Sequence, residues 1–184
     1  DYIDTNLAGF LNILEMCRHH QVKGLVYASS SSVYGSNTKY PVITDDRTYN
    51  PISLYAATKK ANELMAHSYS HLYVLPTSGL RYITVYRPWG RPDMAMYIFT
   101  EKICNGDSIP VFNKGNMKRD FTFIDDIIAG TRSAMEKNYD CEIFNLGNNK
   151  SENLMDMIKI IETNLGKKAH IDFQPRNPGE EYGD

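Results

Sequence analysis

The stretch GLVYASSSSVYG (residues 24–35) decides the fold. It begins with a short apolar run of the kind that forms a buried parallel strand, and it continues into four consecutive serines at 29–32. In open sheets of parallel strands, ligands bind beyond the carboxyl ends of the strands. A buried strand over 24–30 that runs into a cluster of hydroxyl groups therefore indicates the border of a ligand crevice.

Helical and strand-like patterns alternate around this stretch. Residues 5–20 and 53–73 have the spacing of helices, with Ser53 as the N-cap of the second, and 78–86 is the next apolar strand. We expect further helices and strands at 94–105, 108–112, 119–123, 125–137, 142–147, 153–166 and 169–173. This order favours βαβ units, so we predict an α/β fold with a parallel sheet.

The composition excludes several classes of protein. The 184 residues, 42% of them hydrophobic, are enough for a real core, and a net charge of −2 gives no electrostatic case for binding nucleic acid or an anionic membrane surface. No apolar run approaches the ~20 residues of a membrane span. Three scattered cysteines form no disulfide framework, which suits a reducing compartment, so we expect a cytoplasmic protein. The chain opens without Met or a first strand, and we interpret it as part of a longer protein.

Tyr55 and Lys59 are four residues apart in SLYAATKK (53–60), so they share one face of the expected helix. A phenol in water ionises only near pH ~10, but a neighbouring ammonium favours the phenolate. With a serine hydroxyl nearby, such a pair can remove a proton from an alcohol while a nicotinamide cofactor takes the hydride from the same carbon. A Tyr-x-x-x-Lys pair is common by chance, and serines after a strand usually make turns. The order of strand, serines, VYG, polar loop and Tyr55 favours the chemical interpretation.

Five segments together resemble the extended short-chain dehydrogenase/reductase family, and its UDP-glucuronate 4-epimerases in particular. They are NLAGFLNILE (6–15), VKGLVYASSSSVYG (22–35), NPISLYAATKKANELMAHSYSHLY (50–73), TVYRPWGRPDMA (84–95) and RDFTFIDDI (119–127). The resemblance implies a partial Rossmann-type sheet with helices on both faces, formed by 1–90 and returning segments such as 119–148. It also implies a smaller nucleotide-sugar lobe, mainly 91–184.

The resemblance also implies residue roles. Tyr55 is the catalytic base, Lys59 holds the nicotinamide ribose, and Ser30 relays the proton. The other residues expected to border NAD are Ser29, Tyr82, Val85 and the structural Asn6. The residues expected to bind the UDP-sugar are Ser30, Ser31, Ser32, Thr84, Arg91, Val111, Asn113 and Arg119, with Thr84 and Arg91 at a uronate carboxylate and Arg119 at the pyrophosphate.

Ser31 and Ser32 separate the possible reactions. Dehydratase relatives carry Asp-Glu at these two positions, and decarboxylase relatives carry Glu at the position of Ser32. This chain has no acid at either, which implies oxidation, turnover of the keto sugar and reduction, that is, 4-epimerisation of UDP-glucuronate. The alternatives are another nucleotide-sugar 4-epimerase, a decarboxylase, or a non-catalytic remnant, and for Arg91 a solvated surface residue is the default interpretation.

Other features qualify this picture. The sequence has no G-x-G-x-x-G, which normally holds the dinucleotide, and Arg87 replaces the glycine that the family usually has in VYGPWG. A homodimer through the 5–20 and 53–73 helices is a family expectation. His67 and His71 have the spacing of a zinc pair but lack the Glu of H-E-x-x-H, so we predict no metal site.

Overall fold

A three-stranded parallel sheet forms the first of two lobes. The computed structural model describes residues 1–37 and 41–175. The sheet has the order β1-β2-β7, with β1 at Leu25–Ser30, β2 at Thr77–Tyr82 and β7 at Cys141–Leu146. Ser30 is paired with Tyr82, which is in turn paired with Leu146, so the three carboxyl ends lie at one edge.

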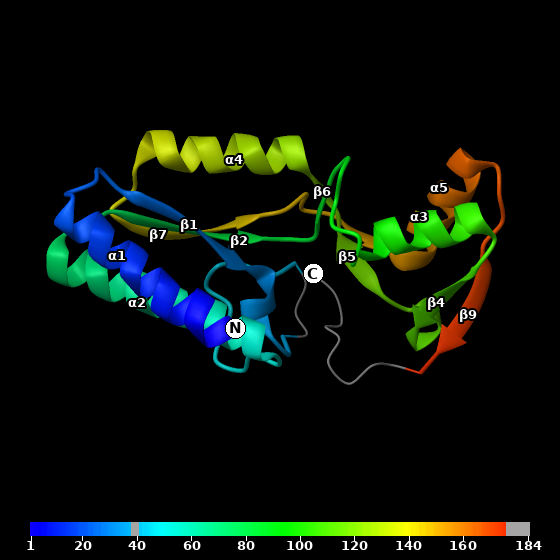
Figure 1. Ribbon diagram of the computed structural model, residues 1–184, viewed down its shortest axis with the longest axis horizontal. Helices are drawn as coiled ribbons and strands as arrows, with labels where there is room; N and C mark the ends of the chain where they lie inside the picture. Colours follow the sequence, from blue (N-terminus) through cyan, green and yellow to red (C-terminus); the bar gives the residue numbers. More distant parts are fainter. Residues whose placement is uncertain (38–40, 176–184) are drawn as a thin grey trace.

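Helices cover both faces of this sheet. α1 (Phe10–His19) and α2 (Leu54–Tyr73) lie on one face, and α4 (Ile124–Lys137) lies on the other (Figure 1). The predicted α/β class with a parallel sheet is confirmed. A π-helical segment, η1 (Ile3–Gly9), precedes α1, so the helix predicted over 5–20 has two different hydrogen-bonding patterns.

The start of α2 has the predicted cap. The side chain of Ser53 accepts a hydrogen bond of 3.1 Å from the backbone N–H of Ala56, which satisfies one of the donors that a helix leaves unpaired at its N-terminus. Tyr55 is therefore held in the first turn of a capped helix of 20 residues.

Two predicted strands are each divided by a change of partner. The strand predicted over 78–86 ends at Tyr82 and resumes as β3 (Val85–Tyr86), because β2 pairs with β7 whereas β3 pairs with β6 (Thr122–Phe123). The strand predicted over 119–123 is likewise divided into β5 (Lys118–Asp120) and β6, since β5 pairs with an element the sequence analysis missed, β8 (Ser151–Asn153).

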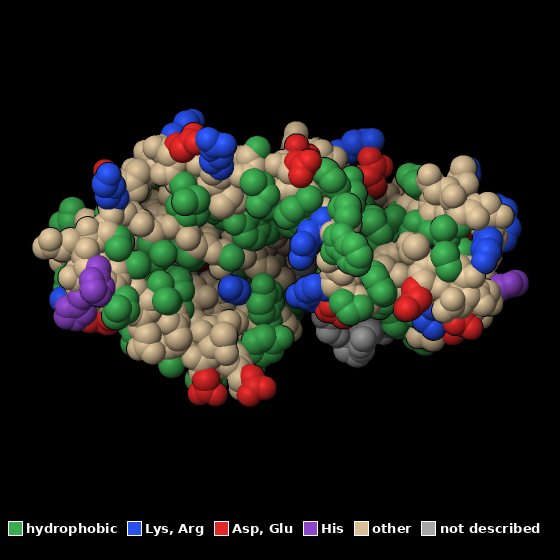
Figure 2. Space-filling model, turned by 45° about the horizontal axis from the view of Figure 1, so that its top comes forward, with side chains coloured by type: hydrophobic (Ala, Val, Ile, Leu, Met, Phe, Trp, Pro, Cys, Tyr) green, Lys and Arg blue, Asp and Glu red, His purple; other side chains and the backbone are tan. Residues whose placement is uncertain are grey.

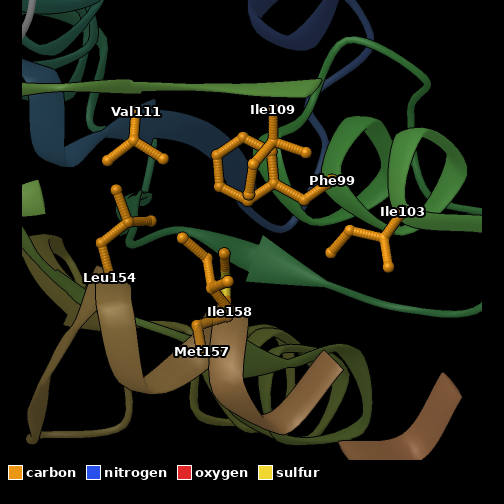
Figure 3. Close-up of a cluster of buried hydrophobic side chains, with 7 residues drawn as sticks. All are labelled: Phe99, Ile103, Ile109, Val111, Leu154, Met157 and Ile158. Atoms are coloured by element: carbon orange, nitrogen blue, oxygen red, sulfur yellow. The ribbon is translucent and has the colours of Figure 1, made fainter. Parts of the chain in front are cut away.

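The second lobe has its own core. It contains η3 (Asn113–Gly115), α3 (Ala95–Asn105), α5 (Leu154–Leu165) and a parallel pair of β4 (Ser108–Phe112) with β9 (His170–Gln174). Seven buried side chains from α3, β4 and α5 pack together: Phe99, Ile103, Ile109, Val111, Leu154, Met157 and Ile158 (Figure 3). Residues 176–184 of the predicted sugar lobe lie outside the described part, and the predicted boundary near residue 90 stays a prediction.

Among the helices formed by the described residues, none is both long and apolar enough to cross a bilayer.

Candidate active site

Tyr55 and Lys59 lie together beside the carboxyl end of β1. The Lys59 ammonium is 5.9 Å from the centre of the Tyr55 ring and donates a hydrogen bond of 3.1 Å to the carbonyl of Ala28. Partial burial lowers the pKa of Lys59. An ammonium in this position can hold ribose hydroxyls and favour negative charge on a neighbouring phenol oxygen.

The serines after β1 differ in orientation. The Ser30 hydroxyl accepts a hydrogen bond of 3.2 Å from the backbone N–H of Ser32, which caps the short 3₁₀ turn η2 (Ser31–Tyr34). Ser29 is buried, and its hydroxyl donates to Glu63 of α2 over 2.6 Å. Ser30, Ser31 and Ser32 therefore lie at the carboxyl end of β1, whereas the Ser29 side chain is occupied by its hydrogen bond to α2.

Asn6 supports the first turns of α2 from behind. Its side-chain amide donates to the hydroxyl of Thr58 over 3.0 Å, and that hydroxyl donates to the carbonyl of Tyr55 over 2.8 Å. Asn62 donates in turn to the carbonyl of Asn6. This short chain of hydrogen bonds connects Asn6 to the backbone of the predicted base.

Tyr82, Thr84 and Val85 follow the neighbouring strand. The Tyr82 hydroxyl lies 3.0 Å from that of Thr131 on α4, so its ring faces the helix on the opposite side of the sheet from α2. The Thr84 carbonyl accepts from the backbone N–H of Thr122 at the change of strand partner. The backbone of Tyr82 is paired with that of Ser30 in the sheet, but its side chain contacts α4. Val85 is the first residue of β3.

Arg91 is paired with Asp93 in a two-pronged contact. Its Nε donates to one carboxylate oxygen over 3.0 Å and a terminal nitrogen donates to the other over 2.5 Å. These hydrogen bonds raise the pKa of Arg91 and lower that of Asp93. The Tyr2 ring lies 5.9 Å from that of Tyr55.

Of the remaining predicted residues, Val111 and Asn113 belong to the second lobe and Arg119 lies on β5. Val111 is fully buried in the core of this lobe, with none of its surface exposed, so it presents no group to a ligand. Asn113 has a positive φ of 49° and donates to the carbonyl of Asn116 over 2.9 Å. Arg119 is paired with Glu152 in the β5–β8 register. Figure 2 shows Lys and Arg side chains near the middle of the molecule, where the two lobes meet.

A family model described as "NAD dependent epimerase/dehydratase family" matches residues 1–147. The chain belongs to this family. The Protein CapI of Staphylococcus aureus is 49% identical over 97% of the chain and 59% of its own length. UDP-glucuronate 4-epimerase 4 of Arabidopsis thaliana is 46% identical over 96% of the chain and 45% of its own length.

A solved member of the epimerase/dehydratase family has the same fold. The UDP-glucuronic acid 4-epimerase of Bacillus cereus, solved in complex with UDP-glucuronic acid and NAD, superimposes with a TM-score of 0.93 at 35% identity. The match covers 99% of this chain and 58% of that one. The chain thus spans about half to three-fifths of the length of these relatives.

NAD is the cofactor of the epimerase/dehydratase family. The side chains present here fit one end of it: Lys59 is half-buried, points its ammonium at the carboxyl end of β1 and lies next to Tyr55, as a ligand of the nicotinamide ribose should. The 184 residues contain no glycine-rich loop to hold the pyrophosphate of NAD.

The backbone conformation of Arg87 and the surroundings of His67 can be compared with what the sequence suggested for them. Arg87 is not among the described residues with positive φ, whereas Trp89, two residues later, has a φ of 60°. The backbone therefore gives no reason for glycine at Arg87.

His67 contacts the thiol of Cys141, with 3.6 Å between Nδ1 and Sγ. No group of three or more metal-ligating side chains occurs within 1–37 and 41–175.

The sequence analysis missed a group of buried polar residues beneath the site. Glu63 of α2 and Arg81 of β2 form a buried ion pair, with Tyr34 and Asn145 beside it. One signal could have found it: Arg81 is a charged residue inside a predicted strand, and a buried charge requires a partner.

Proposed function

We propose that the protein containing this chain catalyses the NAD-dependent 4-epimerisation of a UDP-uronic acid, converting UDP-glucuronate to UDP-galacturonate. The observation that carries the proposal is the placement of Tyr55 and Lys59 beside the carboxyl end of β1. There Ser30 caps η2 (Ser31–Tyr34), here called the serine turn. Phenol, ammonium and hydroxyl are then at the edge of a parallel sheet where ligands bind.

Each of these groups has a role in the proposal. Tyr55, in its phenolate form, removes the proton from the C4 hydroxyl and later returns it. The Lys59 ammonium stabilises this phenolate form of Tyr55 between turnovers. Ser30 hydrogen-bonds to the same sugar oxygen. NAD, when bound, supplies the chemistry that accepts the hydride from C4 and gives it back. The sugar must present its other face before the hydride returns, and that exchange inverts C4.

The serine turn favours epimerisation over the other reactions of the family. Elimination of water or loss of the carboxyl group needs a further acid or base at the sugar, and Ser31 and Ser32 carry only hydroxyl groups. Hydroxyls can bind the keto sugar without protonating or deprotonating it at neutral pH. The site is thus suited to reversible oxidation at C4 with no second reaction.

The uronate carboxylate is assigned to Arg91 and Thr84. Arg91 already binds one carboxylate, that of Asp93, in the bidentate geometry a uronate would use. In the same proposal Arg119 binds the pyrophosphate, and the backbone at Phe112 and Asn113, which follow the buried Val111, binds the uracil. The relatives named for UDP-glucuronate support this choice of sugar.

The proposal extends to assembly and location. Exposed apolar side chains on α1 and α2, among them Leu11, Met16, Leu64 and Leu72, are suited to a homodimer contact between these helices in two copies. We place the protein in the cytoplasm, where its scattered cysteines would stay reduced.

The test is turnover of the natural protein that contains these residues, supplied with NAD. UDP-glucuronate, UDP-glucose and UDP-N-acetylglucosamine are offered in parallel, and the product is identified by proton NMR. The proposal expects UDP-galacturonate from UDP-glucuronate, with much slower turnover of the two neutral sugars. Preferred turnover of a neutral sugar would reassign the substrate, loss of CO₂ would identify a decarboxylase, and no turnover of any would favour a non-catalytic remnant.

A further inference from the structure

A buried charged network lies one to two turns below Tyr55 along α2. Arg81 of β2 donates from Nε and a terminal nitrogen to the two carboxylate oxygens of Glu63, over 2.8 and 2.9 Å. Ser29 donates to Glu63 over 2.6 Å, and Lys60 donates to it over 2.9 Å. Burial raises the pKa of Glu63, but hydrogen bonds from Arg81 and Ser29 outweigh it and leave the pKa below its ordinary value. The carboxylate is therefore ionised and fully partnered.

The same network extends to the segment that leads into α2. The second terminal nitrogen of Arg81 donates to the Tyr34 hydroxyl over 2.9 Å and to the carbonyl of Thr44 over 3.2 Å. Tyr34 donates over 2.6 Å to Asn145 of β7, and the Asn145 amide donates over 3.1 Å to the carbonyl of Val42. Arg81 and Asn145 thus anchor the backbone of residues 41–52, here called the 41–52 loop.

These contacts join the elements that carry the predicted base and the serines. Ser29 precedes the turn η2 and Tyr34 ends it, Glu63 is two turns along α2 from Tyr55, and the 41–52 loop ends next to the N-cap Ser53. Three segments distant in the sequence therefore meet on one guanidinium–carboxylate pair.

Stability alone is a weak explanation for such a pair. Burying two charges costs solvation energy that their attraction barely repays, and apolar side chains of similar volume often serve a core as well or better. What the ion pair provides is direction, because a bidentate guanidinium–carboxylate contact has one geometry.

We propose that Glu63 and Arg81 are positioning residues, which set the placement of Tyr55 against Ser30 by fixing α2 and the 41–52 loop to the end of the sheet. This inference rests on the proposed function for its catalytic consequence. A displacement of about 1 Å in such a site can cost about 100-fold in rate, so loss of the network lowers kcat. The UDP end of the substrate binds elsewhere, so KM changes little.

The experiment uses Glu63→Gln, which removes the charge, and Tyr34→Phe, which removes one hydroxyl from the network and keeps all charges. The matched control is Glu15→Gln. Glu15 forms the same type of bidentate pair, with Arg18 over 3.1 and 2.7 Å, and also accepts from a tyrosine, Tyr69, but on the surface between α1 and α2. If Glu63→Gln fails to fold, Tyr34→Phe alone decides the outcome.

Enzyme kinetics, including a substrate isotope effect, and amide hydrogen exchange are measured on each variant, well below its melting temperature. We expect kcat for UDP-glucuronate to fall about tenfold or more in Glu63→Gln, and less in Tyr34→Phe, with KM within about threefold of wild type. The isotope effect with 4-deuterated substrate should rise, because the C4 step becomes limiting. Amide hydrogen exchange should become faster in 41–57 and stay unchanged in the α4 and α5 helices. Glu15→Gln should match wild type in all of these.

Wild type and Tyr55→Phe are included to separate two failures. Wild-type kcat, isotope effect and exchange in 41–57 for both Glu63→Gln and Tyr34→Phe would overturn the positioning role while leaving the proposed function intact. An inactive wild type, or an active Tyr55→Phe, would overturn the proposed function. In that case the exchange measurement still decides whether Glu63 holds the start of α2.

Discussion

Arg91 is exposed and already paired, and its partner Asp93 is as exposed as itself. In the proposed function, a uronate carboxylate at Arg91 would therefore compete with the carboxylate of Asp93 for one guanidinium. Exposed ion pairs contribute only about 0–1 kcal/mol, so the exchange of one carboxylate for another is inexpensive. The pair can hold the arginine in a receptive orientation until the sugar arrives.

Replacement of Arg91 by Ala tests this assignment. We expect Arg91→Ala to lower kcat/KM for UDP-glucuronate about 10- to 100-fold, as the loss of a charged hydrogen bond predicts, and to change kcat/KM for UDP-glucose little. Arg132→Ala is the matched control, because Arg132 is an exposed arginine paired with Glu136 on α4, away from the serine turn. Equal losses for the two sugars would show that Arg91 contacts a shared part of the ligand or supports the loop.

A second prediction at the scale of single residues is that Glu15 makes the stability of the fold depend on pH. Hydrogen bonds from Arg18 and Tyr69 lower the pKa of Glu15 to about 2. Because the folded pKa lies below the unfolded one, this contribution to stability is present above the unfolded pKa and is lost as the pH falls towards 2. Thermal melts at pH 7 and pH 3 should therefore show a gap between wild type and Glu15→Gln that narrows at the lower pH. A gap that widened would contradict the assigned contacts.

At the scale of elements, strand–helix alternation and capping were readable from the sequence, but the partners of strands were not. Residues 78–86 look like one apolar strand because apolar periodicity reports burial and not the neighbour. The backbone changes partner at Ile83 and Thr84, whose N–H and C=O pair with Leu146 and Thr122 respectively. That exchange depends on β6 and β7, which lie 36 or more residues later in the chain.

Gly35, at the end of the serine turn, joins β1 to the 41–52 loop in a conformation that other residues avoid. Its φ of 59° and ψ of −121° are accessible mainly to glycine, and a Cβ there would lie 2.0 Å from the carbonyl oxygen of Asn50. Since Asn50 precedes α2 by only a few residues, a side chain at Gly35 would push against the segment that carries the N-cap.

Gly35→Ala should therefore lower both thermal stability and kcat. The control is Gly106→Ala: Gly106 also has positive φ, 80°, but its Cβ would meet nothing within 4 Å. We expect the control to lose about 1–2 kcal/mol from the left-handed conformation alone, with normal kcat. Equal losses of stability in the two variants, measured by denaturant unfolding, would show that the contact with Asn50 relaxes without cost.

At the scale of the molecule, two lobes bring different parts of the proposed site together. Tyr55, Lys59 and the serine turn belong to the lobe with the three-stranded sheet, Val111 and Asn113 belong to the other, and Arg119 lies on β5. The chain carries the residues that resemble the catalytic and sugar-binding parts of its relatives. Its 184 residues carry no glycine-rich loop for the pyrophosphate of NAD.

A polypeptide of these 184 residues alone should consequently bind NAD negligibly. In the proposed function Lys59 and Tyr55 contact only the nicotinamide end of NAD. Among the described residues β1 is also an edge of the sheet, with a free row of backbone groups prone to association. Calorimetric titration with NAD and light scattering measure both consequences. Tight binding of NAD by a monodisperse preparation would contradict this account of the cofactor site.

The sequence predicted the proposed site better than the support beneath it. Tyr55 and Lys59 were recognisable because their spacing is local and a helix brings them together by its own geometry. Glu63, Arg81, Tyr34 and Asn145 come from four elements, so only the folded chain shows that they meet. Ser29 and Tyr82 illustrate the same limit, since their side chains face α2 and α4 while their backbones follow the strands.

The central claim is that Tyr55 is the base of an oxidation at C4. Tyr55→Phe in the natural protein, loaded with NAD, tests it most directly, because only the phenol oxygen is removed. We predict that turnover of UDP-glucuronate falls about 100- to 10,000-fold while NAD binding and melting temperature stay at wild-type values. A Tyr55→Phe protein that converts UDP-glucuronate at near wild-type rate would contradict the account.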